Sequence, residues 1–277
     1  MHEQSIDAHV HFWKYNRQRD GWITDHMKIL QKDYLPEHLA PTLKRNGIDG
    51  CVAVQADQSE LETLFLVELA RTHPIIRGVV GWVDLQSEGL EQRLEYFKQF
   101  PVIRGYRHIV QAEPVDFMHG TAFRRGISLL SKFDYTYDIL IYPSQLEAAL
   151  SLVEAFPDQP FVIDHCAKPL IRTGEMENWK TLITRIALHD NVCCKVSGLF
   201  TEADWAEWSP ADFYPYLDVI FKAFGTDRLL FGSDHPVILL AGMYVQWKSM
   251  LEKYMESFST EEKNKVFGGN ATRFYRL

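Results

Sequence analysis

Eight short runs of apolar and β-branched residues recur along the chain, and each is followed by a longer stretch with helical spacing. A strand, its crossover helix and two short loops use roughly 30 residues. Dividing 277 residues among eight such units leaves about 35 per unit, so the pattern indicates repeated βα units rather than a sandwich. The expected strands cover residues 5–12, 48–55, 76–83, 102–108, 135–142, 160–165, 191–197 and 229–233.

Closure of these strands into a (β/α)8 TIM barrel fits the length, because such a barrel typically needs about 250 residues. The alternative is a doubly wound open sheet, but the GxGxxG fingerprint is missing after the first expected strand. We therefore expect one barrel domain spanning 1–277. Its helices are expected near 36–46, 58–72, 88–99, 120–132, 144–156, 175–189, 210–224, 243–256 and 260–267.

The charge and hydropathy of the sequence indicate which partners the protein binds and in which cellular compartment it is expected. The formal net charge is −8 and no long basic run is present, which argues against a nucleic-acid surface. No apolar stretch reaches the roughly 18–20 residues of a membrane span, and the start MHEQSIDAHVHFW lacks the layout of a signal peptide. The four cysteines form no CxxC pair. We expect a cytoplasmic protein, a monomer or homodimer, that binds neither nucleic acid nor membrane.

The first expected strand carries two histidines with alternate spacing. Since strand side chains alternate, Asp7, His9 and His11 are predicted to share one face, with Ile6, Ala8 and Val10 on the other. Active sites of barrels form at the carboxyl ends of their strands, and imidazole there can bind a metal or stabilise an oxyanion. A polar strand face with satisfied histidines is the alternative interpretation.

Other expected strands also end in titratable residues. Asp234 and His235 follow the eighth strand and precede Pro236, and His165 follows the sixth strand. The fourth strand places Arg104, Arg107 and His108 near its end, where arginine suits a bidentate grip on an anion. Each feature has an ordinary structural explanation alone, but four strands ending this way favour a site. The irregular segment 13–35, rich in aromatic and charged residues, is expected to be either a functional loop over the barrel mouth or an ordinary surface excursion.

Seven motifs in this order resemble the amidohydrolase-related branch of the amidohydrolase superfamily, and within it the sugar-acid lactonase group that includes L-fuconolactonase. The similarity runs nearly from end to end. The motifs are IDAHVHFW (6–13), GVVGWVDL (78–85), IRGYRHIVQAE (103–113), FVIDHCAKP (161–169), CKVSGL (194–199), DRLLFGSDHPV (227–237) and NATRFYRL (270–277).

The resemblance implies a distorted (β/α)8 barrel whose catalytic residues are His9, His11, His165 and Asp234. Asp234 would be the general base that activates water, while the three imidazoles polarise the lactone carbonyl directly or through one divalent metal. The same four residues would hold that metal, Zn²⁺ or Mn²⁺, although related lactonases can work without one. Residues expected to bind the substrate, a small sugar-acid lactone, are Arg104, Arg107, His108, Lys168 and His235.

Two departures from the family pattern matter. The fourth strand offers no lysine that could be carbamylated to bridge two metals, so at most one metal is expected; Lys168 and Lys195 are the lysines near strand ends. His235 stands where the lactonase group commonly has tryptophan, and it either alters substrate choice or replaces a packing residue.

Two other functions remain open at this point. A metal-dependent nonoxidative decarboxylase of an aromatic or unsaturated acid would use Asp234 as a proton donor to carbon. A non-catalytic sugar-acid binding protein on the same scaffold would bind ligand without turnover. The sequence leaves the particular sugar acid open, because loop residues read its stereochemistry; Trp22, Tyr142, Trp205 and Trp208 are the candidates.

Overall fold

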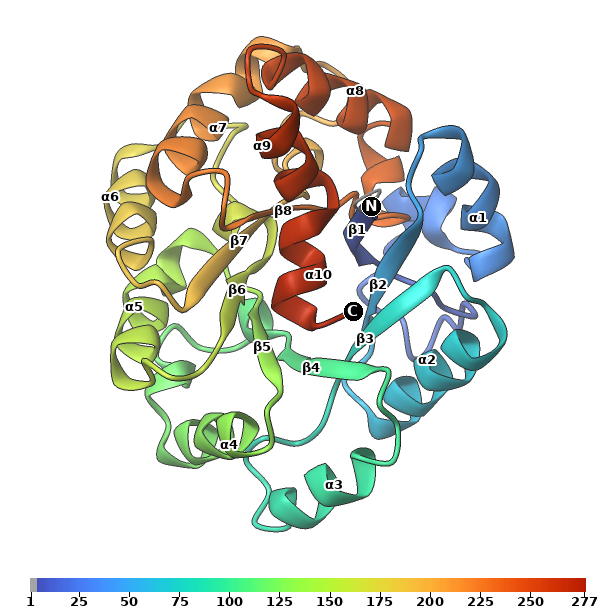
Figure 1. Ribbon diagram of the computed structural model, residues 1–277, viewed down its shortest axis with the longest axis vertical. Coiled ribbons are helices and arrows are strands. Elements are labelled where there is room, and N and C mark those ends of the chain that lie inside the picture. Colours follow the sequence, from blue (N-terminus) through green and yellow to red (C-terminus); the bar gives the residue numbers. More distant parts are fainter. Residues whose placement is uncertain (1–3) are drawn as a thin grey trace.

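Eight parallel strands form the centre of the computed structural model, which describes residues 4–277. Each strand pairs with the next along the chain, and the helices lie outside the ring (Figure 1). The expected barrel is therefore confirmed, as is each expected strand position. The strands are β1 (Ile6–Val10), β2 (Gly50–Val54), β3 (Ile76–Gly81), β4 (Ile103–His108), β5 (Thr136–Ile139), β6 (Phe161–Ile163), β7 (Val192–Val196) and β8 (Leu229–Phe231).

The helices follow the expected positions closely until the last segment of the chain. There α9 is short, a π-helical turn follows, and a further helix, α10, occupies residues that the sequence left unassigned. The α-helices are α1 (Pro36–Arg45), α2 (Glu60–Thr72), α3 (Leu90–Phe97), α4 (Thr121–Lys132), α5 (Leu146–Ala155), α6 (Glu177–Ile186), α7 (Pro210–Phe224), α8 (Tyr244–Tyr254), α9 (Thr260–Asn264) and α10 (Asn270–Tyr275). None within residues 4–277 is long and apolar enough to cross a lipid bilayer.

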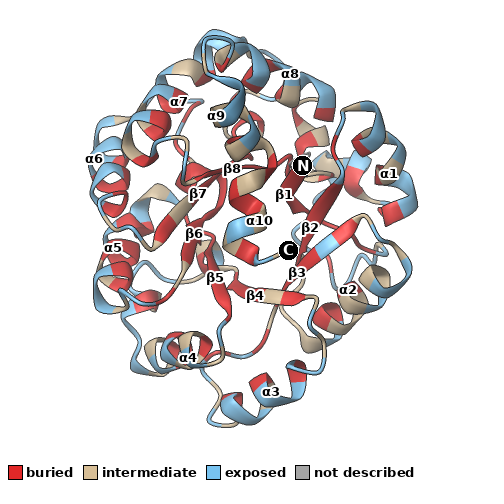
Figure 2. Cartoon of the chain, in the orientation of Figure 1, coloured by how far each residue is buried: buried red, intermediate tan, exposed pale blue. Residues whose placement is uncertain are grey.

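Two hydrophobic cores lie on opposite faces of the strands. The larger core fills the space between strands and outer helices; α4, for example, buries Phe123, Ile127 and Leu130, which recur at helical spacing. The smaller core lies inside the barrel, where Ile6 and Ala8 pack with Tyr275 of α10. Accordingly, the strands are buried while the outer helix faces are exposed, and α10 lies at the centre of the ring (Figure 2).

A bulge in β1 decides which of its side chains face the interior. Asp7 pairs with Cys51 but Val10 pairs with Ala53, so one extra residue of β1 is inserted between them. Ala8 and His9 consequently both face the barrel interior, and Asp7 points outward, where its carboxylate accepts hydrogen bonds from the backbone N–H of His9 and of Ser233. The prediction that Asp7 shares a face with His9 and His11 is wrong, because the bulge breaks the alternation.

The seam between β8 and β1 completes the ring. The backbone N–H of Asp234 donates to the His9 carbonyl at 2.9 Å, and that of His11 donates to the His235 carbonyl at 2.7 Å. These bonds hold the carboxyl ends of the first and last strands together. They therefore place His9, His11 and Asp234, far apart in sequence, within one small volume.

Candidate active site

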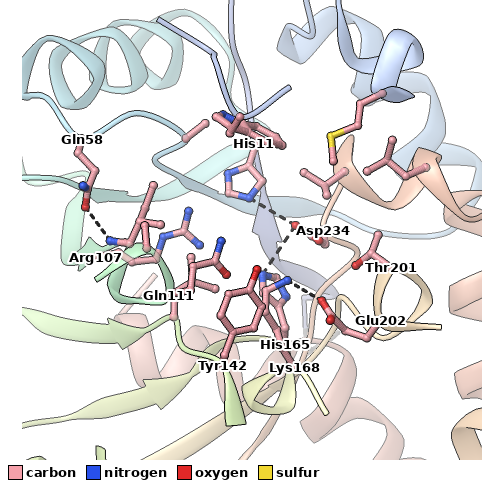
Figure 3. A pocket seen from close by; sticks show the side chains of 18 of the residues that line it. His11, Gln58, Arg107, Gln111, Tyr142, His165, Lys168, Thr201, Glu202 and Asp234 are labelled. Atoms are coloured by element: carbon pink, nitrogen blue, oxygen red, sulfur yellow. Dashed lines mark hydrogen bonds and ion pairs between the residues drawn. The ribbon is translucent and has the colours of Figure 1, made fainter. Parts of the chain in front are cut away.

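A cavity of about 520 Å³ opens at the carboxyl ends of the strands. Its polar wall includes His11, His165 and Asp234 (Figure 3). Trp22 and Met27 from segment 13–35 form part of its apolar wall. Of the two alternatives for this segment, the loop over the barrel mouth is confirmed. Of the other aromatic candidates, Tyr142 and Trp205 also line the cavity; the indole of Trp208 instead stacks on Phe200, with ring centroids 4.2 Å apart.

Three residues, which we call the cavity layer, converge at the floor of this cavity: His11, His165 and Asp234. The Oδ1 atom of Asp234 lies 3.4 Å from Nε2 of His11 and 3.9 Å from Nε2 of His165. All three side chains are at most 6% exposed. Burial raises the pKa of Asp234, but its neighbours His165, His11 and Lys168 outweigh burial and hold the pKa below its usual value. Asp234 is therefore a carboxylate at neutral pH, as a general base must be.

The tautomer of His11 follows from its backbone partner. Its Nδ1 atom lies 2.8 Å from the carbonyl oxygen of Val54. Since a carbonyl can only accept, Nδ1 carries the proton and donates it, which leaves a lone pair on Nε2. This lone pair faces Asp234 Oδ1 and His9 Nε2, the latter at 3.1 Å. An atom in that position can bind a cation or accept a proton from water, but in the neutral ring it cannot donate to a carbonyl.

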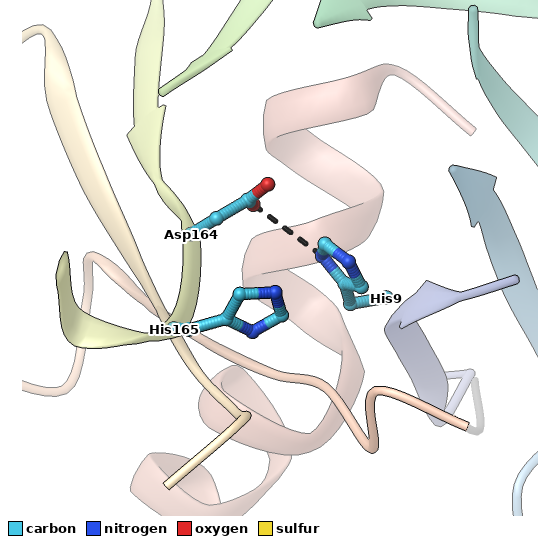
Figure 4. Close-up of side chains that lie close together, drawn as sticks. All are labelled: His9, Asp164 and His165. Atoms are coloured by element: carbon cyan, nitrogen blue, oxygen red, sulfur yellow. Dashed lines mark ion pairs between the residues drawn. The ribbon is translucent and has the colours of Figure 1, made fainter. Parts of the chain in front are cut away.

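His9 connects the cavity layer to a set of charged residues deeper in the barrel. Its Nδ1 lies 3.1 Å from Nζ of Lys195 and 3.3 Å from Oδ1 of Asp164, as Figure 4 shows for the aspartate. Burial, reinforced by the charge of Lys195, holds the pKa of His9 well below its usual range. Burial also lowers the pKa of His165. Both imidazoles are therefore neutral near pH 7.

The deeper set, which we call the buried ion layer, consists of Asp138, Asp164 and Lys195, all completely buried. Lys195 Nζ lies 2.5 Å from Asp138 Oδ2 and 3.0 Å from Asp164 Oδ1. Tyr275 of α10 donates its hydroxyl to Asp138 Oδ2 at 2.7 Å. The hydrogen-bond partners of the Lys195 ammonium are Asp138 Oδ2 and His9 Nδ1, and Asp164 pairs with it as a second carboxylate. This completely buried layer thus links the last helix to the floor of the site, out of reach of a substrate.

Two residues of the cavity layer have left-handed backbone conformations. Asp234 has φ 59°, and His165 has φ 53° at the start of four consecutive residues with positive φ that ends at Lys168. Such conformations cost roughly 1–2 kcal/mol per residue and persist only where the surroundings impose them, which is common at functional sites. Gly198 is part of these surroundings: it has φ 65°, and a Cβ there would lie 2.6 Å from the His165 ring.

Arg107 lines the cavity, but both terminal nitrogens of its guanidinium pair with protein groups. Nη1 donates to Asp164 Oδ2 at 3.0 Å, and Nη2 donates to the carbonyl oxygen of Gln55. Its side chain is 3% exposed. The guanidinium therefore pairs with Asp164 and contacts His9, with Arg107 Nη1 3.3 Å from His9 Nε2. Its two terminal nitrogens are not available together for a bidentate hydrogen bond to a ligand.

Three residues expected to bind the substrate lie outside the cavity lining. Arg104 lies near the amino end of β4, where Gly78 packs against both Arg104 and Leu277. His108 faces the outer helices, hydrogen bonds Glu113 at 2.9 Å and stacks on Phe117. His235 packs against Tyr34 with ring centroids 5.6 Å apart. These placements correct the expectation. His108 follows Arg107, which lines the cavity, and ordinary strand alternation turns its side chain to the opposite face, whereas Arg104 lies nearer the amino end of the strand.

Lys168, the remaining expected substrate ligand, does line the cavity. Its Nζ atom pairs with Glu202 Oε1 at 2.7 Å, and both side chains are mostly buried, at 14% and 16% exposed. Glu202 belongs to a short 3-10 helix, Phe200–Glu202, and was not identified from the sequence. Asp138, Asp164 and Tyr275 were missed as well; a carboxylate inside an apolar strand, as in TYDI, was the signal available for Asp138.

The donor atoms around Asp234 fit a single divalent metal. His9 and His11 Nε2 are 3.1 Å apart, and Asp234 Oδ1 lies 3.8 Å from His9 Nε2 and 3.4 Å from His11 Nε2. A four-coordinate site with bonds of about 2.0–2.1 Å places neighbouring ligand atoms about 3.4 Å apart. His165 Nε2 lies at a similar distance from Asp234, and Asp164 would orient His9 through its other ring nitrogen.

Known proteins resemble this chain along almost all of its length. The amidohydrolase family model matches residues 6–277. An L-fucono-1,5-lactonase of Burkholderia multivorans is 36% identical over 98% of this chain and 96% of its own, and one of Burkholderia ambifaria is 35% identical over 98% and 95%. A crystal structure of a Burkholderia multivorans amidohydrolase with bound zinc, 36% identical, covers 99% of both chains with a TM-score of 0.95.

Proposed function

This chain belongs to the amidohydrolase family, and on that premise we propose that it hydrolyses the ring ester of a sugar-acid lactone of the L-fucono- or L-rhamnono-lactone type. The observation that carries the proposal is the cavity layer. A buried carboxylate with a lowered pKa lies beside the imidazoles of His11 and His165 at the floor of a cavity sized for a small ligand, and burial lowers the pKa of His165. The full-length similarity to L-fucono-1,5-lactonases supports the choice of substrate class.

Asp234 is the general base of the proposed reaction. Its carboxylate takes a proton from the water that attacks the lactone carbonyl, and the ring C–O bond breaks as the proton passes on to the leaving alkoxide. The lone pair on His11 Nε2 helps to orient the water. His165 Nδ1 lies 2.8 Å from the Ser197 hydroxyl. In the tautomer in which Nδ1 accepts from this hydroxyl, Nε2 carries the proton and donates to the developing oxyanion.

His9 has a supporting part in this proposal. It is buried beneath His11 and His165, and its ring centroid lies 4.8 Å from that of His11 and 4.3 Å from that of His165. Contacts with Lys195, Asp164 and Arg107 fix its ring. It thereby holds the cavity layer in place and provides one further nitrogen ligand.

His9, His11, His165 and Asp234 would hold one divalent cation, and Zn²⁺ or Mn²⁺ suits this nitrogen and oxygen donor set. When bound, such an ion supplies Lewis-acid activation of the carbonyl and lowers the pKa of a bound water. A lactone needs less carbonyl activation than an amide, because its alkoxide leaves more readily. Without the ion, the imidazoles and Asp234 would therefore supply the proton transfer and the hydrogen bonds by themselves.

The charges in the cavity favour a lactone without a carboxylate of its own. Within residues 4–277, the arginine and lysine side chains that line the cavity are Arg107 and Lys168, and each is paired with a carboxylate. A dicarboxylate lactone, or the acid substrate of a decarboxylase, would add negative charge beside Asp234 with no free cation to receive it. A hydroxylated ring lactone requires only hydrogen bonds.

The test is hydrolysis of a panel of aldonolactones that includes L-fucono- and L-rhamnono-lactones, followed by acid release with a pH indicator. The panel is run before and after removal of metal with a chelator, and with an aromatic acid whose decarboxylation is followed in parallel. We expect acid release from at least one neutral lactone and no CO₂ from the aromatic acid. Decarboxylation without lactone hydrolysis would overturn the proposal, while activity after chelation would establish that the metal is dispensable.

A further inference from the structure

The Lys168–Glu202 pair is the charged feature of the cavity that the proposed reaction leaves unexplained. The two terminal nitrogens of Arg107 pair with Asp164 and Gln55, and Asp234 serves the reacting water. By contrast, within residues 4–277 the side chains of Lys168 and Glu202 make one hydrogen bond, to each other, at 2.7 Å. An ammonium has three donors and a carboxylate about four acceptor sites, so both groups retain spare capacity.

The pair is rigidly connected to the catalytic floor. Lys168 ends the left-handed turn that begins at His165, and its backbone N–H donates to the His165 carbonyl at 2.8 Å. Glu202 is held through its own carbonyl, which accepts the backbone N–H of Arg172 at 3.0 Å. A ligand bound by this pair is therefore held at a fixed distance from His165. Figure 3 shows the two side chains on the cavity wall next to Asp234.

A donor and an acceptor fixed side by side match a particular chemical group. Two adjacent hydroxyl groups of a sugar ring are separated by about a hydrogen-bond distance, and each can donate and accept. One hydroxyl can accept from the ammonium while its neighbour donates to the carboxylate. A single carboxylate or phosphate on the ligand would instead be repelled by Glu202.

We propose that Lys168 and Glu202 determine the specificity of this site by binding two adjacent hydroxyl groups of the lactone ring. The inference rests on the proposed lactone hydrolysis and names the part of the substrate that the pair recognises. Because the ion pair is mostly buried, a substrate lacking either hydroxyl leaves a desolvated charge without its partner. A site of this kind rejects such an analogue far more strongly than a hydrophobic pocket rejects a missing methylene.

The experiment compares kcat/KM for L-fucono-1,5-lactone and its single-deoxy analogues at C2, C3 and C4. The proteins are the wild type, Lys168→Met, Glu202→Gln and the control Glu207→Gln, which removes an exposed carboxylate from the neighbouring loop. In the wild type and the control, we expect loss of either of two adjacent hydroxyls to lower kcat/KM by about 10²-fold or more. In Lys168→Met and Glu202→Gln, kcat/KM for the parent lactone should fall by a similar factor, mainly through a higher KM. The ratio of kcat/KM between the parent lactone and the analogues that lack those hydroxyls should then be only about threefold.

A purely structural ion pair gives a different result. Both variants would then lower kcat/KM by the same factor for the parent and for every deoxy analogue, or melt at lower temperature with unchanged discrimination, and the inference would be overturned. Should the wild type hydrolyse no lactone at all, the proposed function fails separately. The inference is then tested by calorimetric binding of the intact lactone and its deoxy analogues, where loss of the same discrimination in the variants supports it and its persistence refutes it.

Discussion

Two layers of ionisable side chains cross the barrel, one above the other, and they differ in the atoms they leave free. The cavity layer of His11, His165 and Asp234 keeps a lone pair, a ring nitrogen and carboxylate oxygens directed at the cavity. The buried ion layer of Asp138, Asp164 and Lys195 directs its charges at one another, and Tyr275 and Arg107 complete it. Under the proposed function, similar residue types take part in the reaction in the cavity layer and hold the site in place in the buried ion layer.

The comparison also explains the opposite pKa shifts of buried carboxylates. Burial alone raises the pKa of a carboxyl group, as it does for Glu62, to about 7. Asp164 is equally buried, yet Lys195, together with His9 and Arg107, holds its pKa well below the usual value. Asp138 pairs with the same lysine, yet burial dominates there and raises its pKa to about 6. One cationic partner therefore does not offset burial in this barrel, whereas the several partners of Asp164 do.

The largest effect is expected from removing the cation of the buried ion layer. Lys195→Met leaves Asp138 and Asp164 buried without their shared partner, and breaking a buried ion pair in this way costs about 3–5 kcal/mol. Urea denaturation should show this loss in the free energy of unfolding. The control Lys180→Met removes an exposed lysine of α6 and should change it by less than about 0.5 kcal/mol. Equal stabilities of the two variants would contradict the structural role of the layer.

A substitution in the cavity layer should instead reduce activity with little effect on folding. In His165→Asn the new residue tolerates the left-handed backbone, but it removes the nitrogen that reaches the cavity. We expect kcat/KM for a hydrolysed lactone to fall by about 10²- to 10³-fold, the size of effect seen when one oxyanion donor is lost. The melting temperature should stay within a few degrees of the wild type. A large drop in melting temperature with retained activity would reverse the assignment of the two layers.

Glu62 is a buried carboxyl group outside both layers, and the pH dependence of protein stability tests whether burial raises its pKa. Its folded-state pKa is raised from 4.5 to about 7, so its contribution to stability is fully present below pH 4.5 and is lost as pH rises through 7. Glu62→Gln removes this penalty and should make the protein more stable than the wild type at pH 8.5, by at most about 3 kcal/mol. At pH 4.5 the difference should vanish. Parallel stability curves for the two proteins across this range would refute the shift.

The smallest effect is expected where α10 meets the buried ion layer. Tyr275→Phe removes one buried hydrogen bond to Asp138, which should cost about 1–2 kcal/mol of stability and leave kcat/KM within twofold. The matched control is Tyr254→Phe, whose hydroxyl donates to exposed Asp218 at 2.8 Å, and a loss below about 0.5 kcal/mol is expected. A large loss of activity in Tyr275→Phe would show that the layer does more than support the site.

The sequence predicts the barrel well because each strand and helix has its own local signal. Short β-branched runs and helical spacing locate β1 to β8 and the helices as far as α9. The residues at the carboxyl ends of β1, β6 and β8 also follow, since any parallel barrel brings these ends together. The sequence alone therefore places His11, His165 and Asp234 at one end of the barrel.

What the sequence could not provide depends on register and on distant partners. One inserted residue in β1 breaks the alternation that sequence spacing assumes for Asp7 and His9. On β4, Arg104 lies toward the amino end, and His108 faces away from the cavity. Glu202 acquires its importance from an ion pair with Lys168, 34 positions away. An ion pair between residues far apart in sequence produces no periodic pattern. From the sequence alone, such residues therefore look like ordinary charged loop residues.

The most direct measurement of the central claim is the initial rate of acid release from L-fucono-1,5-lactone by the wild type and by Asp234→Asn. Both proteins are assayed at equal concentration, with matched melting curves, before and after chelation. Because Asp234 is the proposed base, we predict that the substitution lowers kcat/KM by about 10²- to 10⁴-fold in either condition. A variant that hydrolyses the lactone within about threefold of the wild-type rate would contradict the account.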